Sequence, residues 1–414
     1  MINNIKGTKD ILPNESQLWQ YVENKIHNFF KLFGYSEIRT PKFEDTKLFN
    51  RSIGEDTDIV SKEMYSWIDQ GGNNLTLKPE VTASVVRSII QHKLNYSNKI
   101  NKLYYIDSLF RRERPQKGRF RQFEQFGIEA IGSDYPEQDV EVISMAYYFY
   151  KEMGLDNLKL KINSIGSKET RIKYKKALHE FLFDEQDKLT DTSKKRLISN
   201  PMRILDTKVD FEIEIIKDAP HIIDYLSPDE KEHFQKILNY LDQLNINYVI
   251  DNMLVRGLDY YSKTVFEIQS DLLGAQSALC GGGRYDYLIE ELGGKATPAI
   301  GFAAGIERLI IALNDNFKIP EKYPDIYIIS IGEKAIEKSI EIAKNLRCRK
   351  NLSVITDNLR QSMKSQMKEA NKLNVQQTII IGEEEIKNNK LIIKDMKSGD
   401  QEEIDCDKVE TYFK

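Results

Sequence analysis

One stretch of the chain decides its fold: residues 110–129, which read FRRERPQKGRFRQFEQFGIE. Between about residue 103 and residue 131, apolar and polar side chains alternate on both sides of this charged centre. A period of two residues is typical of strands that bury one face. The stretch therefore predicts two antiparallel strands joined by an unusually long, basic loop.

One face of this predicted hairpin carries side chains suited to a nucleotide. It combines an arginine, two acids, an amide, an aromatic ring and a glycine: Arg111, Glu113, Phe123, Gln125, Gly127 and Glu129. Arginine offers a two-pronged fork to phosphate or carboxylate, a phenylalanine ring can stack on a purine, and glycine lets a ligand approach the backbone. The alternative is a solvated sheet face with ordinary ion pairs. Such faces rarely combine Gln, Gly and Phe with three arginines in the joining loop.

Two common nucleotide-binding patterns are missing from the sequence. There is no Gly-x-x-x-x-Gly-Lys-Ser/Thr phosphate loop, and no Gly-x-Gly-x-x-Gly follows a predicted strand. If the chain binds a nucleotide, arginines on an antiparallel sheet must hold it. This expectation agrees with the hairpin.

Three further segments are candidates for the same site. Residues 254–261 read LVRGLDYY and residues 281–285 read GGGRY, while a helix expected to open near Ala303 carries Arg308 in its early turns after two glycines. From these residues alone, the paired tyrosines fit a protein core better than a ligand site. The glycines fit a turn as well as a ligand contact, and Arg308 fits a phosphate contact and a surface position equally.

The composition sets limits on the fold and the partners. A length of 414 residues predicts two or three domains, and 40% hydrophobic with 30% charged residues is typical of a soluble globular protein. The net charge is −4 and the pI is near 5.9. Nucleic acid, if bound, must therefore meet local basic patches.

The cysteines and histidines predict neither a metal site nor a disulfide. Cys280, Cys348 and Cys406 lie far apart without a Cys-x-x-Cys pair, so all three are expected to be small buried side chains in a reducing compartment. The five histidines lack metal-ligand spacing. With no signal-peptide stretch and no membrane-spanning apolar run, the chain is expected to be cytoplasmic, without a membrane partner.

Hydrophobic periodicity indicates the other elements of the first part of the chain. Residues 15–33 are expected to form an amphipathic helix, followed by a short strand over 35–40, and residues 136–153 another helix. Residues 168–247 are rich in lysine and glutamate and poor in motifs, which indicates a helical insertion. A strand is expected over 248–256.

The last part of the chain has a pattern of its own. Residues 314–324 contain two prolines and are expected to be a linker. Strands are then expected at 326–331, 352–356 and 377–382, in alternation with helices at 333–347 and 360–373. Such alternation predicts an α/β unit with a mainly parallel sheet.

Taken together, these segments resemble histidyl-tRNA synthetases, a family of class II aminoacyl-tRNA synthetases, in order and over essentially the whole chain. The resemblance rests on residues 7–10 (GTKD) for the family's opening, 15–41 for motif 1, 110–129 for motif 2, 301–308 for motif 3, and the tail from about 325 for the anticodon-binding domain. Residues 254–261 and 278–285 resemble two signatures peculiar to the histidine enzymes. These two are far more specific than the class-wide motifs.

The resemblance implies a fold and an activity. The fold is α+β: a class II antiparallel sheet core with flanking helices over residues 1–320, interrupted by the helical insertion at 168–247, and an α/β anticodon-binding domain over 325–414. The activity is that of a histidine–tRNA ligase, which activates L-histidine with ATP and Mg²⁺ and transfers it to tRNA(His). Motif 1 forms the dimer interface in the family, so a homodimer is expected.

The resemblance also implies site residues by position. Histidine binding falls to Glu80, Val81, Thr82, Arg111, Gln125, Glu129, Arg256, Tyr260, Tyr261 and Tyr285. ATP binding falls to Arg111, Glu113, Arg119, Phe123 and Arg308. The catalytic residues are Arg256 and Arg111, of which Arg256 stabilises charge at the reacting α-phosphate. The loop residues that would meet the tRNA acceptor end are Arg114, Gln116 and Lys117, where the family's loop senses an extra guanosine at the 5′ end of histidine tRNA.

One segment departs from the family pattern. Residues 76–82 read TLKPEVT, with Lys78 and Val81 where the family usually has Arg and Gly. Val81 is expected to add bulk beside the site for the histidine amino group. The closest alternative is a non-catalytic, histidine-sensing regulatory subunit of ATP phosphoribosyltransferase, which tends to lose the two histidine signatures and the C-terminal domain. A tRNA-sensing pseudo-synthetase would be expected to lose the ATP-binding arginines. This chain keeps all of these features.

Overall fold

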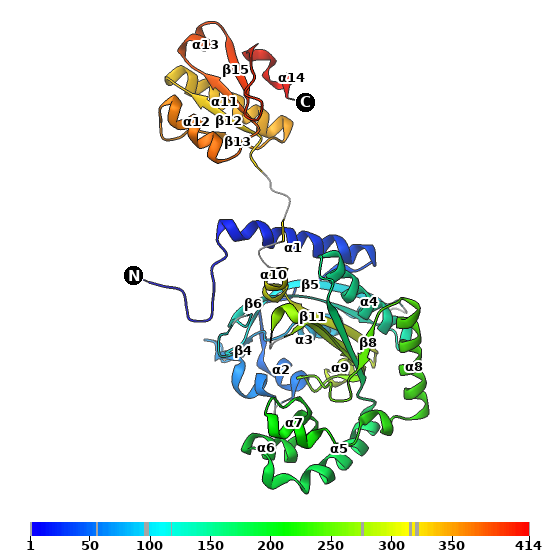
Figure 1. The fold of residues 1–414 in the computed structure, drawn as a ribbon. Coiled ribbons are helices and arrows are strands. Elements are labelled where there is room, and N and C mark those ends of the chain that lie inside the picture. The colour runs from blue at the N-terminus through cyan, green and yellow to red at the C-terminus, as the bar shows by residue number, and fades with distance from the viewer. Residues whose placement is uncertain are drawn as a thin grey trace. The chain divides into compact units, whose positions relative to one another are not determined.

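The computed structural model describes residues 2–54, 57–94, 99–116, 118–274, 277–313, 317–318 and 323–413. The chain divides into two compact units, residues 1–318 and residues 319–414 (Figure 1). Most of the predicted linker lies outside the described residues.

An eight-stranded sheet forms the centre of the first unit, in the strand order β1-β5-β6-β11-β10-β9-β7-β8. The strands are β1 (Ser36–Glu37), β5 (Asn101–Phe110), β6 (Gln122–Ile131), β7 (Leu158–Ser164), β8 (Tyr248–Ile250), β9 (Ser262–Ser270), β10 (Ala278–Arg284) and β11 (Ala299–Gly305). The two outermost strands pair in parallel with their neighbours, and every other pair is antiparallel. The predicted antiparallel core is therefore confirmed.

The predicted hairpin consists of β5 and β6, which pair along their full length. Its first strand ends at Phe110, so Arg111 and Glu113 lie in the connecting loop and not on the strand face where parity placed them. The chain changes partner at this point, because the amide of Arg112 donates to the carbonyl of Glu63 at 2.7 Å. A contact from another part of the chain thus ends the strand.

Four helices cover one face of the sheet: α1 (Pro13–Leu32), α4 (Pro136–Glu152), α8 (Pro228–Gln243) and α10 (Ile306–Leu313). The predicted helix over 15–33 is confirmed as α1, which buries Trp19, Val22, Ile26, Phe29 and Phe30. These positions recur every three or four residues, so they form one apolar stripe against the sheet. Burial of that stripe, more than helix propensity, stabilises such a helix.

The opposite face of the sheet packs against a second apolar cluster and borders a cavity. Helices α3 (Thr82–Gln91) and α9 (Leu288–Glu291) contribute to this cluster. A small side sheet, in the order β2-β4-β3, carries α2 and leads into α3. Its elements are β2 (Phe43–Asp45), β4 (Asn74–Leu77), β3 (Tyr65–Ile68), α2 (Thr46–Ile53) and the π-helical turn Ile59–Glu63.

The insertion is helical, and it closes the cavity from one side. It contains α5 (Lys168–Phe183), α6 (Asp191–Ser199), α7 (Asp210–Ile216) and three 3-10 turns, Gln186–Lys188, Pro201–Asp206 and Ile222–Tyr225, before α8. The buried carboxylate of Glu212 organises its tip by accepting hydrogen bonds of 2.5–3.0 Å from Thr190, Ser193 and Thr207. Ser227 and Glu230 form a capping box that starts α8.

Two local predictions near the site are wrong. The strand expected over 248–256 forms only as β8, and the helix expected to open near Ala303 begins at Ile306. Residues 281–283, which fitted a turn and a ligand contact equally, lie inside β10. The later helix start and the strand at 281–283 have the same cause, because β10 and β11 pair with each other in the middle of the sheet.

The second unit is an α/β domain whose sheet has the order β13-β12-β14-β15-β16. Its elements are β12 (Ile326–Ser330), α11 (Glu333–Lys350), β13 (Val354–Thr356), α12 (Met363–Lys372), β14 (Gln377–Ile381), α13 (Glu383–Lys387), β15 (Lys390–Asp395), β16 (Gln401–Asp405), the 3-10 turn Cys406–Lys408 and α14 (Val409–Tyr412). The prediction of a mainly parallel sheet is wrong, because β15 and β16 form an antiparallel extension after two parallel pairs. The connections after β14 (residues 382–389, with α13) and after β15 (residues 396–400) are shorter than the dozen or more residues that a parallel crossover needs, which favours that arrangement.

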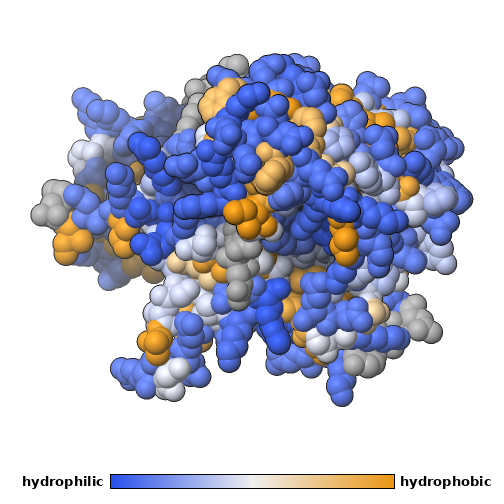
Figure 2. Space-filling view, turned by 90° about the horizontal axis from the view of Figure 1, so that it is seen from below, coloured by the Kyte–Doolittle hydropathy of each residue, from blue (hydrophilic) through white to orange (hydrophobic). Residues whose placement is uncertain are grey.

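Hydrophilic residues dominate the face of the molecule in Figure 2, with apolar residues in small groups between them. In the described part of the chain no helix is long and apolar enough to cross a membrane. Cys280 and Cys406 are buried, but Cys348 is exposed, so the expectation of three buried cysteines is wrong for Cys348. It lies on α11 but outside the buried stripe of that helix, which consists of Ala335, Ser339, Ile342, Ala343 and Leu346.

Candidate active site

A cavity of about 1060 Å³ lies on the face of the eight-stranded sheet that the insertion borders. Strands β6, β9, β10 and β11, the hairpin loop and the segment before β9 supply most of its lining. It brings together thirteen of the predicted site residues: Glu80, Thr82, Arg111, Glu113, Arg119, Phe123, Gln125, Glu129, Arg256, Tyr260, Tyr261, Tyr285 and Arg308. Segments more than 200 residues apart in sequence thus meet in one pocket.

Three of the described site residues that the sequence predicted do not line the cavity. Val81 is buried in the second apolar cluster just before α3, although its neighbours Glu80 and Thr82 do line the cavity. Arg114 and Gln116 lie exposed on the hairpin loop, and Lys117 lies outside the described residues. The loop bends back on itself through an isolated bridge between Gln116 and Arg119.

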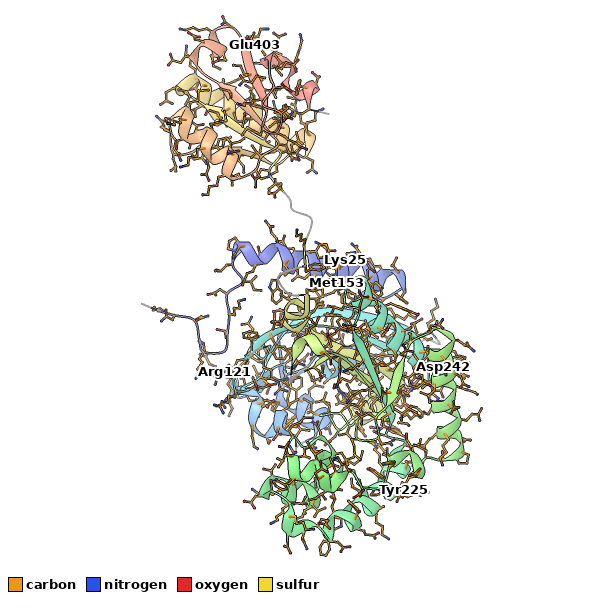
Figure 3. All side chains as sticks on the ribbon, in the orientation of Figure 1. Lys25, Arg121, Met153, Tyr225, Asp242 and Glu403 are labelled. Carbon is orange, nitrogen blue, oxygen red and sulfur yellow. The ribbon has the colours of Figure 1, made fainter. Side chains whose placement is uncertain are left out.

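The hairpin loop is held by the N-terminal segment. The amide of Arg121 donates to the carbonyl of Gly7 at 2.7 Å, and Figure 3 shows Arg121 where that segment passes the loop. Gly7 has φ +90°, and a Cβ there would lie within 3 Å of the side chains of Arg121 and Pro115. Only glycine meets both conditions. The family-like opening of the chain therefore supports the loop that carries Arg119 to the pocket.

A buried carboxylate marks one end of the cavity. Glu129 accepts hydrogen bonds from the hydroxyl groups of Thr82 at 2.7 Å and Tyr285 at 2.5 Å. Its neighbour in the sheet is Gly301, where a Cβ would lie 2.0 Å from Oε2 of Glu129, so glycine provides the space for the carboxylate. Burial raises the pKa of Glu129 to about 8, although the two hydroxyl groups oppose that shift.

Three tyrosines enclose this end of the cavity. The ring of Tyr260 lies 4.8 Å from that of Tyr261 and 5.8 Å from that of Tyr285. All three are buried and belong to the second apolar cluster, and burial raises the pKa of each hydroxyl. Sequence alone favoured a core role for the pair 260–261. In the structure these rings belong to the apolar core and also line the cavity, because the second apolar cluster forms part of the cavity wall.

Glu80 lies at the same end and is also buried. Its Oε1 accepts a hydrogen bond of 2.9 Å from the amide of Ala83, in the first turn of α3. Burial raises its pKa, while backbone hydrogen bonds at the helix start and the charge of Arg111 oppose this. The cavity therefore contains two carboxyl groups that a cationic or hydrogen-bond-donating ligand would stabilise in the ionised form.

Four arginines also line the cavity: Arg119 and Arg308 lie near each other, while Arg111 and Arg256 lie nearer to Glu80 and Tyr261. Arg111 donates from Nε to the carbonyl of Pro79 at 2.8 Å, and its guanidinium lies over the ring of Phe123 at 5.4 Å from the ring centre. Glu113 lies between Arg111, at 3.6 Å, and Arg119, at 3.5 Å. Arg308 donates to the carbonyl of Ala278 at 2.7 Å and lines the same region.

Arg256 extends into the cavity from the segment between β8 and β9. It donates from Nη1 to Glu267 at 2.7 Å, while its Nε is buried without a hydrogen-bond partner in the described structure. A Cβ at Gly281 would lie 2.0 Å from Nη2 of Arg256, so the first glycine of residues 281–283 makes room for the guanidinium. These groups together can bind a polyanion and stabilise negative charge.

Several lining residues escaped the sequence analysis. Glu267 and Gln269 lie on one face of β9 and hydrogen-bond to each other at 2.6 Å, and their strand parity was the one available signal. Lys161, Lys208 and Lys217 also line the cavity, the last two from the insertion. No motif marks these lysines, because their position depends on how the insertion folds over the sheet.

Comparison with protein families agrees with this geometry. A family model described as histidyl-tRNA synthetase matches residues 7–309, and a model described as an anticodon-binding domain matches residues 325–414. The chain belongs to the histidyl-tRNA synthetase family. Among its relatives, histidine–tRNA ligase of Clostridium botulinum strain 657 is 48% identical over 411 residues, which cover 99% of this chain and 98% of the relative. That of Clostridioides difficile strain 630 is 49% identical over 400 residues, which cover 96% and 95%.

Solved structures of histidyl-tRNA synthetases have the same fold. The ligand-free S. aureus histidyl-tRNA synthetase matches with a TM-score of 0.85 and 39% identity over 100% of both chains. A Bacillus halodurans protein described as an ATP phosphoribosyltransferase regulatory subunit/histidyl-tRNA synthetase matches with a TM-score of 0.66 and 24% identity over 92% of this chain and 98% of its own. The latter likeness shows the fold alone.

Proposed function

We propose that the cavity joins L-histidine to ATP and then transfers the histidyl group to tRNA(His), the reaction of a histidine–tRNA ligase. The observation that carries this proposal is the polarity of one continuous cavity. Two buried carboxyl groups and three tyrosines occupy one end, Arg119 and Arg308 lie near each other, and Arg111 and Arg256 lie near Glu80 and Tyr261. A cationic amino acid with a flat polar ring fits the first end, and a triphosphate fits the arginines.

Histidine would bind at the carboxyl end. Glu129 and Tyr261 would face the two imidazole nitrogens, since a carboxyl group and a phenol can each satisfy one of them. Glu80, Thr82 and Gln125 would receive the α-amino group, and Tyr260 and Tyr285 would close the pocket. Leaving these buried groups unpaired disfavours amino acids that lack the second ring nitrogen.

ATP would bind beside the arginines. Phe123 would stack on the adenine, and Glu113, whose buried Oε2 has no hydrogen-bond donor in the described structure, would accept from the adenine amino group. Arg119 and Arg308 would hold the outer phosphates. Arg111 would bridge the α-phosphate and the histidine carboxylate, which brings the two reacting groups together.

The first chemical step would be attack of a histidine carboxylate oxygen on the α-phosphorus. A new P–O bond forms, the bond to the β-phosphate oxygen breaks, and pyrophosphate leaves with the electron pair. Arg256 would stabilise the charge that develops on the α-phosphate oxygens. In the second step a hydroxyl of the terminal tRNA ribose attacks the carbonyl carbon and AMP leaves.

Mg²⁺ would accompany the triphosphate. In the described part of the chain no group of three metal-binding side chains occurs, but Mg²⁺ is commonly held by one or two carboxylates together with substrate phosphates. Glu267 offers carboxylate oxygens in the cavity beside Arg256 and fits that requirement. The ion would neutralise phosphate charge and help pyrophosphate to leave.

The tRNA would contact both units. The second unit would bind the anticodon. Arg114, Gln116 and Lys117, on the loop between the two strands of the hairpin, would meet the acceptor end. Phosphate contacts by the two cations would position the tRNA, and Gln116 would read the extra 5′ guanosine.

We also propose a homodimer in the cytoplasm. Apolar side chains on α1 and the side sheet, Leu32, Phe43, Trp67 and Ile68, are exposed in the single chain, which suits burial in a subunit interface. The exposed thiol of Cys348 suits a reducing compartment. Sedimentation equilibrium of the purified chain tests the dimer, and a monomer at micromolar concentration contradicts it.

The central experiment is ATP–pyrophosphate exchange with each of the twenty amino acids. We expect exchange with histidine alone, followed by charging of tRNA(His) transcripts. Histidine binding without exchange would favour the regulatory alternative, whose function needs no adenylate. Exchange with another amino acid would contradict the assignment of Glu129 and Tyr261 to the imidazole.

A further inference from the structure

One arginine at the end of β10 lies outside the cavity, and each of its three guanidinium nitrogens donates hydrogen bonds. Arg284 is 0% exposed, and its guanidinium donates to both carboxylate oxygens of Asp139 at 2.6–3.0 Å. It also donates to the carbonyls of Ser133 and Tyr135 at 2.9 Å and to Asp286 at 3.2 Å. Asp139 lies on α4, 145 residues away in sequence, and is likewise 0% exposed.

The backbone ladder breaks at the same place. Gly283 of β10 is opposite Val265 of β9, but Arg284 is opposite Ser262, so two residues of β9 bulge out of the pairing. One of them, Lys263, has φ 47°, a left-handed conformation that costs a non-glycine residue about 1 kcal/mol or more. On the β9 side, regular strand pairing therefore does not hold Arg284 and the residue after it. Pairing with β11 continues there, with Arg284 opposite Ile300, and the side-chain bonds of Arg284 add the constraint that β9 does not supply.

The residue after Arg284 is Tyr285, which points to the other side of the sheet. Its amide donates to the carbonyl of Ala299 at 2.8 Å, and its hydroxyl donates to Glu129 at 2.5 Å. The next side chain, Asp286, turns back and pairs with Arg284 and with Lys263 at 3.0 Å. Tyr285 is thus held between two anchored neighbours.

Asp139 keeps its charge in this buried position. Burial alone would raise its pKa, but the charges and hydrogen bonds of Arg284 and His233 outweigh it and lower the pKa. His233 comes from α8, at the end of the insertion, with Nε2 3.5 Å from Asp139. The ion pair is therefore intact over the pH range in which the enzyme would work.

We propose that Arg284 is a positioning residue for histidine recognition: its ion pair with Asp139 sets the place of the Tyr285 hydroxyl and, through it, the carboxyl group of Glu129. This inference rests on the proposed function, since Glu129 is the group that would face the imidazole. A buried ion pair contributes little net stability compared with apolar packing of equal volume. It does fix geometry, and a displacement of about 1 Å near a reacting group can cost roughly a hundredfold in rate.

A double-mutant cycle tests the inference on the full-length chain. We expect Arg284→Lys, which keeps the charge but loses the fork, to raise the histidine KM in pyrophosphate exchange by about tenfold, as for one lost hydrogen bond to a charged group. The ATP KM should change by less than about twofold, because Tyr285 and Glu129 would contact histidine and not ATP. Tyr285→Phe should act in the same direction. If Arg284 acts through the Tyr285 hydroxyl, the histidine KM of the double variant should equal that of Tyr285→Phe.

Asp139→Asn removes the other partner of the ion pair, so it can replace Arg284→Lys in the cycle if that variant does not fold. The matched control is Glu141→Gln, two residues along α4, which breaks the ion pair of Glu141 with Lys102 of β5 at 2.7 Å. That control should shift the melting temperature without changing the histidine KM. Two results would overturn the positioning role. One is that the rises in histidine KM of the two single variants multiply in the double variant. The other is that the ATP KM rises as much as the histidine KM. Absence of histidine-dependent exchange in the wild type overturns instead the proposed function.

Discussion

The two units of the chain differ in what their interiors contain. In the described part of the first unit, buried residues include ionisable groups: Lys78, Glu80, Asp107, Glu129, Asp139, Glu212 and Arg284. In the described part of the second, the buried polar residues are neutral: Ser330, Ser339, Gln366 and Thr378. Burying a charge costs several kcal/mol unless it is paired or hydrogen-bonded. The first unit therefore bears a cost that the second avoids.

The difference follows from how each sheet is covered. Apolar clusters cover both faces of the second unit's sheet. In the first unit one face is mainly apolar, with the buried ion pair of Arg284 and Asp139 beside α4, and the other contains the cavity, around which carboxyl and guanidinium groups meet. Chemistry is thus confined to the first unit. Recognition by the second must use its surface, where Leu359, Arg360 and Met363 are exposed.

The largest expected effect comes from separating the units. A chain that ends at Lys318 should keep histidine-dependent pyrophosphate exchange within about twofold. Its kcat/KM for tRNA charging should fall by roughly 10²–10⁴, because two linked binding modules gain that much in avidity. Steady-state aminoacylation measures the loss, and supplying residues 319–414 as a separate chain is the control that should not restore it. Undiminished charging would remove the anticodon-binding role.

The next effect concerns one of the arginines of the cavity. Arg256→His should lower the rate of adenylate formation by about 10²–10³, as for the loss of one preorganised donor to a charged transition state. The histidine KM should change much less. Single-turnover kinetics separates the two parameters. Arg349→His, which breaks an ion pair with Glu410 in the second unit, should leave both unchanged. Equal changes in both parameters for Arg256→His would show ground-state binding only.

A smaller effect is expected at the carboxyl end. Glu129→Gln should weaken histidine binding by about ten- to a hundredfold, because one charge-assisted hydrogen bond contributes roughly 1.5–3 kcal/mol. ATP binding should be nearly unaffected. Calorimetric titration with each ligand measures this. Glu212→Gln, which changes another buried carboxyl group, one in the insertion, should lower stability but not histidine affinity. An unchanged histidine affinity in Glu129→Gln would exclude Glu129 from the pocket.

The hairpin loop tests whether an exposed residue contributes specificity. Gln116→Ala should reduce the preference for tRNA(His) with the extra 5′ guanosine by about five- to tenfold, near the lower end for one base contact. Arg114→Ala should instead weaken binding of both transcripts and reduce the salt dependence. Aminoacylation of paired transcripts decides between the two roles. Equal kcat/KM for both transcripts with the wild type would reject guanosine reading by this loop.

The last prediction is a pH dependence of the stability of the folded chain. Burial raises the pKa of Glu129 from 4.5 to about 8, so the folded chain retains a proton that the unfolded chain has lost across this interval. The stability of the ligand-free wild type should therefore fall as the pH rises from about 5 to 8, by at most about 1.4 kcal/mol per unit from this group. Glu129→Gln removes that contribution.

The measurement is the melting temperature of wild type and Glu129→Gln over the same pH range. The melting temperature of Glu129→Gln should increase relative to that of the wild type as the pH rises. Glu307, whose pKa burial raises to about 7, acts in the same direction but is present in both proteins, so it cancels from the difference. A difference that does not depend on pH would mean that Glu129 ionises normally in the empty pocket.

Much of this protein follows from the sequence alone. The alternation around residues 110–129 determined the central hairpin, the apolar spacing from Leu18 to Phe33 determined α1, and the strand–helix alternation after residue 325 determined the α/β unit. The residue types of the hairpin indicated a nucleotide site in the same way, whereas the tyrosines, Glu80 and Arg256 were assigned to the site only by the family resemblance. Period and residue type are local properties, and a sequence displays them directly.

Only the tertiary structure decided where these groups meet. The backbone amide of Arg112 bonds to the carbonyl of Glu63 just after β5 ends, and Val81 is buried in the core. Strand β11 extends to Gly305 before α10 begins. The ion pair of Arg284 with Asp139, the lysines that the insertion brings to the cavity and the raised pKa of Glu129 all depend on contacts between distant segments. Burial and pairing arise only when such segments pack together, and no local pattern encodes them.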